Sequence, residues 1–181
     1  MADLHQRCWD IRWRLMMSSM YHQKRERFLD GLDRFAKFLS AIGGAAAFAQ
    51  IKADPELSMW FAGSIALIST LSLTYGPAAK ARRHAELARD YKRLEAELVE
   101  CGNDFDDAKL SGFDAKLLRL EASEPATLGA LVTQCHNELS VAFDHAAKVT
   151  PLPWWQRPLK NVFDFDQSLG NVTPPTKPDQ A

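Results

Sequence analysis

The chain has 181 residues, of which 46% are hydrophobic, and its 22 Lys and Arg against 23 Asp and Glu leave a formal net charge of -1. This length allows one ordinary domain with a core, or a small membrane protein with a water-exposed lobe. The balanced charge argues against a nucleic-acid-binding domain, so we expect no nucleic acid partner.

The three cysteines, Cys8, Cys101 and Cys135, lie far apart and form no CxxC pair. They support neither a disulfide framework nor a zinc site. The N-terminus MADLHQRCWDIRW lacks a basic stretch followed by an apolar one. We therefore expect no cleavable secretory signal, and any membrane insertion would use internal segments.

Residues 1–37 are predicted to form an N-terminal amphipathic helix, or two joined helices. Helix-forming residues run from Leu4 to about Lys37 without proline. An apolar stripe at helical spacing comprises Trp9, Trp13, Met16, Met20, Phe28, Leu32 and Phe35, and a basic side comprises Arg12, Arg14, Lys24, Arg25 and Arg27. We expect the Trp and Met side chains to pack against a partner helix. The basic side would also suit phosphate headgroups.

Residues 38–79 contain two uncharged runs separated by KADPE, residues 52–56. The first run, Phe38 to Ile51, is short for a membrane span of about 20 residues, unless it starts at Phe35 and Lys37 extends toward water. The second, Leu57 to Ala79, is about 34 Å long as a helix. Helices this apolar are confined to large cores or membranes. We therefore predict an all-α membrane protein with a two-transmembrane helical hairpin; a soluble bundle with a buried hairpin is the alternative.

The sequence also predicts how the hairpin is oriented. Asp54 and Pro55 suit a tight turn between the two helices. Cations crowd both far ends, with Lys24, Arg25, Arg27, Arg34 and Lys37 before the hairpin and Lys80, Arg82, Arg83, Arg89, Lys92 and Arg93 after it, whereas the turn has Lys52 alone. The positive-inside rule then places both termini in the cytoplasm. Trp60, Tyr75, Lys80, Arg82 and Arg83 are the predicted membrane-interface residues of this region.

Small residues inside the hairpin predict close helix packing. They form the pairs Ser40 with Gly44, Gly43 with Ala47, and Ala62 with Ala66. Such pairs serve contacts within one hairpin or between copies equally well, and we expect a homo-oligomer in the lipid bilayer. The hydroxyls of Ser69, Thr70, Ser72 and Thr74 either line a hydrated path in an oligomer or bond to other helix groups, and the second interpretation is favoured.

Residues 80–149 are predicted to form a cytosolic helical lobe. Gly76 and Pro77 predict a break, followed by a helix that ends at Gly102 and carries an apolar stripe at Leu87, Tyr91, Leu94 and Leu98. The stripe fits a coiled coil or a partner within the chain. A second helix is expected from about Asp104, with Asp106 and Asp107 near its start, to Ala122, and a third from Ser123 as N-cap to about Lys148.

Residues 150–181 are predicted to form a Trp- and Pro-rich segment with a disordered tail. Trp154 and Trp155 lie near Arg157 and Lys160, a combination that suits the headgroup region of a membrane. The same side chains would otherwise cap the helical lobe. Asn171 to Thr173 matches an N-glycosylation acceptor, which has no meaning in a cytoplasmic tail.

The sequence carries no motif for catalysis, and we predict a non-enzymatic protein with no catalytic, metal or cofactor-binding residues. The five histidines show no metal-ligand spacing. Cys135 and His136 are the nearest approach to a nucleophile and a base, but neighbours in a helix do not face each other. Phosphate-binding, dinucleotide-binding and GxSxG motifs are absent from the sequence.

The order of segments resembles the SLATT group of bacterial two-transmembrane proteins, which are associated with SMODS nucleotidyltransferases and SLOG nucleotide-sensing domains. The resemblance rests on the basic helix YHQKRERFLDGLDRFAKFLS, the tight hairpin, the basic exit GPAAKARRHAELA and the helical extension, and it covers Leu4 to about Lys148. It implies a multi-pass effector of the bacterial inner membrane that oligomerises and perforates or depolarises the membrane in conflict with phage.

The resemblance transfers no catalytic residues. Because the sequence shows no sensor or synthetase domain, a signal would come from a nucleotide-signalling or sensor protein encoded nearby, or from a diffusible ligand. The alternative function is that of a membrane adaptor, for example a phage or prophage product that binds a host membrane protein.

Overall fold

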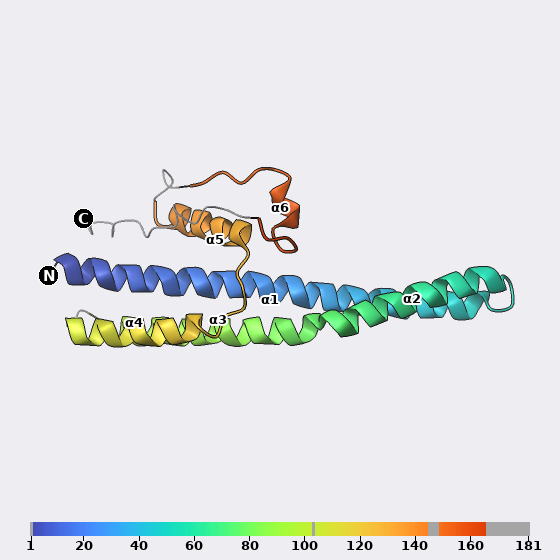
Figure 1. The fold of residues 1–181 in the computed structure, drawn as a ribbon, viewed down its shortest axis with the longest axis horizontal. Coiled ribbons are helices and arrows are strands. Elements are labelled where there is room, and N and C mark those ends of the chain that lie inside the picture. Colours follow the sequence, from blue (N-terminus) through green and yellow to red (C-terminus); the bar gives the residue numbers. More distant parts are fainter. Residues whose placement is uncertain (1, 103, 145–148, 166–181) are drawn as a thin grey trace. The chain divides into compact units, whose positions relative to one another are not determined.

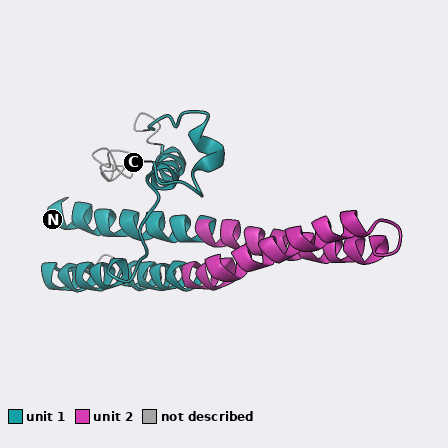
Figure 2. Cartoon of the chain, turned by 45° about the vertical axis from the view of Figure 1, so that its right-hand side comes forward, with its two compact units in different colours: residues 1–24, 85–181 teal, residues 25–84 magenta. Residues whose placement is uncertain are grey.

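The computed structural model describes residues 2–102, 104–144 and 149–165, in which all regular secondary structure is helical. The helices are α1 (Ala2–Gln50), α2 (Pro55–Tyr75), α3 (Pro77–Glu100), α4 (Asp107–Glu121), α5 (Gly129–Ala142) and α6 (Gln156–Leu159) (Figure 1). The predicted all-α fold class is confirmed for these residues. The chain divides into two compact units, which we call unit 1 (residues 1–24 and 85–181) and unit 2 (residues 25–84) (Figure 2).

The first helix does not stop where the sequence changes from amphipathic to apolar. α1 is a single helix of 49 residues that contributes to both units. No proline interrupts it, and each of its interior glycines costs only about 1 kcal/mol relative to alanine. A change in surface chemistry is therefore accommodated within one helix.

The turn and the break that the sequence predicts on either side of α2 are confirmed. Asp54 is the N-cap of α2, its side chain accepts a hydrogen bond from the backbone N–H of Leu57, and Pro55 begins the helix. At the other end Gly76 has φ of 63° and donates its N–H to the carbonyl of Ser72. Glycine adopts this left-handed conformation without the steric cost of a Cβ, and Pro77 then starts α3.

Unit 1 contains a core formed by α1, α3 and α4. Its buried side chains are Ile11, Leu15, Tyr91, Leu94, Leu98, Leu110, Phe113 and Leu117. The apolar stripe of α3 therefore finds its partners within the same chain. Burying side chains of this size contributes about 1.5–3 kcal/mol each.

The Trp and Met stripe of α1 packs against α5, which confirms the predicted contact with a partner helix. Trp9, Trp13 and Met16 form a buried cluster with Leu139. Cys135 lies in a neighbouring cluster with Tyr21 and Leu131. α1 thus buries two faces in unit 1, one toward α3 and α4 and one toward α5.

The predicted start of the last long helix was wrong, because α5 begins at Gly129 rather than after Ser123. The hydroxyl and the backbone N–H of Ser123 both donate to the carbonyl of Leu120, at 2.8 and 2.9 Å. Ser123 therefore completes the end of α4 instead of capping α5. The start of α4 is also later than expected, since Asp106 caps it by accepting from the N–H of Lys109 at 2.7 Å. The predicted end at about Lys148 was also wrong, because α5 ends at Ala142 with Phe143 as its C-cap. The predicted disordered tail lies outside the described residues.

Candidate membrane-facing surface

The functional candidate in unit 2 is a helical hairpin formed by the second half of α1 and by α2 (Figure 2). Small and polar residues lie at the contact between its two helices. The hydroxyls of Ser40 and Ser69 lie 3.4 Å apart, and the Ser58 hydroxyl donates to the carbonyl of Ala47 at 2.9 Å. Gly43 faces Ile65 so closely that an added Cβ would lie 2.9 Å from its Cγ1 atom. A small residue is therefore needed at position 43.

The predicted packing residues divide between the inside and the outside of this hairpin. Ser40, Gly43 and Ala47 lie at the contact between α1 and α2. An added Cβ on Gly44 would meet nothing within 4 Å, and Ala62 and Ala66 are exposed. Positions 40, 43 and 47 share one helix face, whereas position 44 is rotated by about 100° from position 43. Gly44, Ala62 and Ala66 therefore remain open to contacts outside the hairpin.

The predicted lining residues divide in the same way. Ser69 contacts Ser40 inside the hairpin, and Ser72 also lines the space between the helices. Thr70 and Thr74 are exposed, and their hydroxyls donate to the carbonyls of Ala66 and Thr70 at 2.8 and 2.9 Å. The two threonine hydroxyls thus bond to backbone carbonyls of their own helix, as the interpretation favoured from the sequence predicts. Their part in a hydrated path stays a prediction.

The outer surface of the hairpin is apolar. None of the residues of α2 is buried, and Leu73 is 84% exposed. The exposed large apolar side chains of the two helices are Leu32, Phe35, Phe38, Ile42, Phe48, Leu57, Met59, Trp60, Phe61, Leu67, Leu71, Leu73 and Tyr75. Contiguous exposed apolar surface on this scale indicates a site of contact with another protein or with a membrane.

One helical run in the described part of the chain is long and apolar enough to cross a membrane. It lies within Pro55–Glu100, and its most apolar window has no buried residue. The apolar half of α1 is not long and apolar enough by the same measure, in agreement with the short uncharged run from Phe38 to Ile51. Membrane association is therefore supported by α2 alone, and the second span belongs to the proposal below.

The apolar surface is bounded by cations. On α1 these are Arg34 and Lys37, which bond to Asp30 at 2.8 Å and to Asp33 at 2.6 Å. After α2, the Lys80 ammonium lies 3.5 Å from the centre of the Tyr75 ring, and Arg82 and Arg83 are exposed. The structure thus brings two predicted interface residues, Tyr75 and Lys80, into contact. Trp60, 69% exposed, lies on α2 near the turn.

A groove that no sequence pattern predicts lies between α1 and α2, next to this charged boundary. Its volume is about 440 Å³. It is lined by Leu32, Phe35 and Ala36 of α1 and by Ile68, Leu71 and Tyr75 of α2. Helical periodicity predicts which residues share a helix face. It does not predict where two packed helices leave an unfilled space between them.

Trp154 and Trp155 lie in unit 1, before α6. Trp154 is 82% exposed, whereas Trp155 packs edge-on against Phe165 at 5.2 Å between ring centres. The segment is attached to α5 by two hydrogen bonds between Asn137 and the backbone of Thr150, at 2.6 and 2.8 Å. Trp154 therefore contributes little to the packing of unit 1. Its contact with a membrane stays a prediction.

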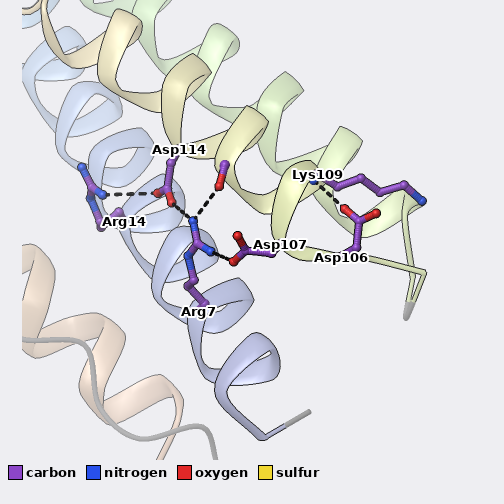
Figure 3. Close-up of polar contacts among 7 residues, drawn as sticks. Arg7, Arg14, Asp106, Asp107, Lys109 and Asp114 are labelled. Carbon is purple, nitrogen blue, oxygen red and sulfur yellow. Dashed lines mark hydrogen bonds and ion pairs between the residues drawn. The ribbon is translucent and has the colours of Figure 1, made fainter.

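Cations of α1 form interhelical ion pairs in unit 1, and Figure 3 shows those of Arg7 and Arg14 with Asp114 of α4. Arg7 contacts Asp107, Ser111 and Asp114 of α4, and Arg14 lies 2.7 Å from Glu121. Lys24 pairs with Glu138 of α5 at 2.8 Å. These cations orient α1 against its neighbours. The predicted contact of the basic side with phosphate headgroups stays a prediction.

A buried polar cluster in unit 1 was missed by the sequence reasoning. The side chain of His22 is fully buried and its Nε2 lies 2.9 Å from Oε1 of Glu124. The Tyr91 hydroxyl donates to the same carboxylate oxygen, and the rings of His22 and Tyr91 stack at 5.6 Å. Burial, and then the bond to Glu124, raise the pKa of Tyr91. Tyr91 was assigned to the apolar stripe correctly, but nothing in the sequence pairs it with Glu124.

The arrangement of Cys135 and His136 does not suit nucleophilic catalysis. Cys135 packs with Tyr21 and Leu131, whereas the His136 ring lies edge-on to Trp13 at 5.8 Å. Burial raises the pKa of Cys135 to about 12, so the thiol stays protonated at neutral pH. Within the described residues no group of three or more His, Cys, Asp or Glu side chains is placed to hold a metal ion.

Comparison of the chain with protein-family models, with curated proteins and with solved structures finds no match.

Proposed function

We propose that the protein is held in a bacterial inner membrane by the α1–α2 hairpin, with both termini in the cytoplasm. The exposed apolar surface of α2, a helix with no buried residue, carries this proposal. Leaving that surface in water would forgo about 25 cal/mol for each Å² of apolar area, whereas lipid tails solvate it. The cations after α2 and before the apolar part of α1 support the cytoplasmic placement of both ends.

The second span is the apolar half of α1. Its inner face is matched to α2 by Gly43 and by the serine contacts, so the two helices would enter the bilayer as one hairpin. Pairing with α2 supplies the close packing that favours helix association in lipid. The shortness of this span would be met by local thinning of the bilayer and by extension of Lys37 toward water.

Extraction and labelling of the full chain test this topology. Alkaline carbonate should leave the wild-type protein in the membrane pellet. In a chain whose free cysteines Cys8, Cys101 and Cys135 are replaced by serine, an impermeant maleimide should label Ala53→Cys, in the turn, in intact spheroplasts, and should label Ala79→Cys only after lysis. Labelling of both positions before lysis, or release of the protein by carbonate, would contradict the proposal.

We further propose that the protein acts without catalysis, as an oligomeric effector that permeabilises the membrane. The resemblance to SLATT proteins suggests this activity, and the small residues that the hairpin leaves outward, Gly44, Ala62 and Ala66, support oligomer formation. The exposed threonines of α2 would then face other copies. A nearby-encoded nucleotide-signalling or sensor protein is the proposed source of the trigger.

Reconstitution tests this activity. Wild-type protein in phosphatidylglycerol vesicles should release an entrapped dye, and Ala62→Leu with Ala66→Leu should reduce both crosslinked oligomers and release. Ala45→Leu changes an exposed alanine of α1 instead of α2. It is the matched control and should release dye like the wild type. Vesicles that stay sealed at all protein densities, with the protein inserted, would refute permeabilisation in the absence of a trigger and would require the same assay with a signalling partner.

A membrane adaptor is the second candidate, and the exposure of Trp154 favours it. Exposed tryptophans are characteristic anchors of protein interfaces. Affinity capture from membranes with wild-type protein should then recover a partner that Trp154→Ala loses. Recovery of the protein with only its own copies would remove this candidate.

A further inference from the structure

The groove between α1 and α2 is open to the surroundings of the hairpin. Phe35 and Leu71, on opposite helices, line it and are still 58% and 60% exposed. Its volume of about 440 Å³ lies within the range of small-molecule sites. The lining is apolar apart from the hydroxyls of Ser72 and Tyr75. The groove therefore suits a flexible hydrocarbon chain that enters from the side.

The Lys80 ammonium group lies at one end of this groove. Tyr75 lines the groove, and the Lys80 ammonium lies 3.5 Å from the centre of its ring. No carboxylate among the described residues forms an ion pair with Lys80. The positive charge at the mouth is thus available to an anion that is attached to an apolar chain.

We propose that the groove holds one acyl chain of an anionic phospholipid, whose phosphate contacts the Lys80 ammonium. This inference rests on the proposed insertion of the hairpin in a membrane and adds a specific ligand to it. A phospholipid joins the two features of the site in one molecule, because its chain enters the apolar groove while its phosphate stays at the charged boundary. An apolar helix of a second copy is the competing occupant of the groove.

Native mass spectrometry of the full chain tests the proposal. Protein purified in detergent and stripped of lipid is incubated with phosphatidylglycerol or with phosphatidylcholine of the same acyl chains. The wild type should retain one phosphatidylglycerol per chain, at least fivefold more often than phosphatidylcholine. Lys80→Ala should remove this preference, whereas Lys52→Ala, which deletes the lysine of the distant turn, should keep it.

A second pair of variants addresses the groove itself. Ala36→Phe places a ring in the groove and should reduce the retention of both lipids at least fivefold, whereas Ala45→Phe adds the same ring to an exposed position of α1 and should leave it unchanged. Equal lipid retention by Ala36→Phe and Ala45→Phe would overturn the proposal. A wild-type protein that binds no lipid, but forms an oligomer that Ala36→Phe dissociates, would overturn it in favour of a second copy.

Carbonate extraction of the membranes from which the protein is purified distinguishes failure of the lipid site from failure of the membrane hairpin. A wild-type protein that resists extraction but retains no phospholipid would refute the lipid site and leave the membrane hairpin intact. A protein that carbonate releases would refute both.

Discussion

Helices α5 and α2 show how differently the two units use apolar sequence. α5, in unit 1, buries seven of its 14 residues, among them Leu131, Cys135 and Leu139. α2, in unit 2, has 21 residues and buries none of them. Both helices are rich in apolar side chains, but α5 has partners on α1 and α2 has only one neighbouring helix in unit 2. The apolar side chains of α2 therefore have no cover within unit 2, and this exposure is the physical basis of the membrane proposal.

The largest effect is expected from a buried tryptophan. Trp13 is fully buried between α1 and α5, so Trp13→Ala should lower the free energy of unfolding by about 3–5 kcal/mol. Trp154→Ala, at an exposed tryptophan, should change it by less than about 0.5 kcal/mol. Chemical unfolding in detergent micelles, followed by helical circular dichroism, measures both. A similar loss for the two variants would mean that burial does not distinguish these positions.

The second prediction sharpens the contrast between exposed leucines of the two units. Leu67 of α2 and Leu118 of α4 are similarly exposed, at 62% and 57%. Leu67→Arg should oppose membrane insertion by about 2.5–3.5 kcal/mol and release a large fraction of the protein into the carbonate-soluble phase. Leu118→Arg should leave the protein in the pellet. Full membrane retention of Leu67→Arg would argue that this face of α2 does not contact lipid.

The third prediction concerns the polar cluster inside unit 1. Tyr91→Phe leaves the partly buried Glu124 carboxylate without one of its donors and should cost about 1–3 kcal/mol near neutral pH. Because the fold raises the pKa of Tyr91, its contribution is complete below the ordinary value of about 10 and is lost as the pH rises above that value. The stability difference between wild type and Tyr91→Phe should therefore shrink at high pH. A difference that stays constant would contradict the bond.

The smallest effect is expected from two adjacent glycines of α1. Gly43→Ala forces the Ile65 side chain to move and should destabilise the hairpin by about 1 kcal/mol or more. Gly44→Ala meets open space and should stabilise it by up to about 1 kcal/mol through helix propensity. Thermal unfolding in micelles measures the sign of each change. A gain from Gly43→Ala would place the α1–α2 contact elsewhere.

The local features of the fold were predictable because they depend on neighbouring residues. Asp54 and Pro55 start α2, and Gly76 and Pro77 separate α2 from α3, as the sequence indicates. Ser123 was assigned wrongly to the start of α5 because a serine before Glu and Pro resembles an N-cap, whereas its hydroxyl bonds to the end of α4. Single-residue signals at helix ends are ambiguous when two helices are close in sequence.

The sequence by itself determined that the chain is helical, where α2 begins and ends, and that the stretch from Leu57 to Ala79 is uncharged, because periodicity, caps and composition are local properties. Only the tertiary structure decided which apolar faces have partners. In the structure Trp13 is buried and α2 is exposed. Gly43 lies against α2 whereas Gly44 faces away from it, and a groove lies beside Tyr75. It also joined His22, Tyr91 and Glu124, because contacts between residues distant in sequence depend on how the helices pack.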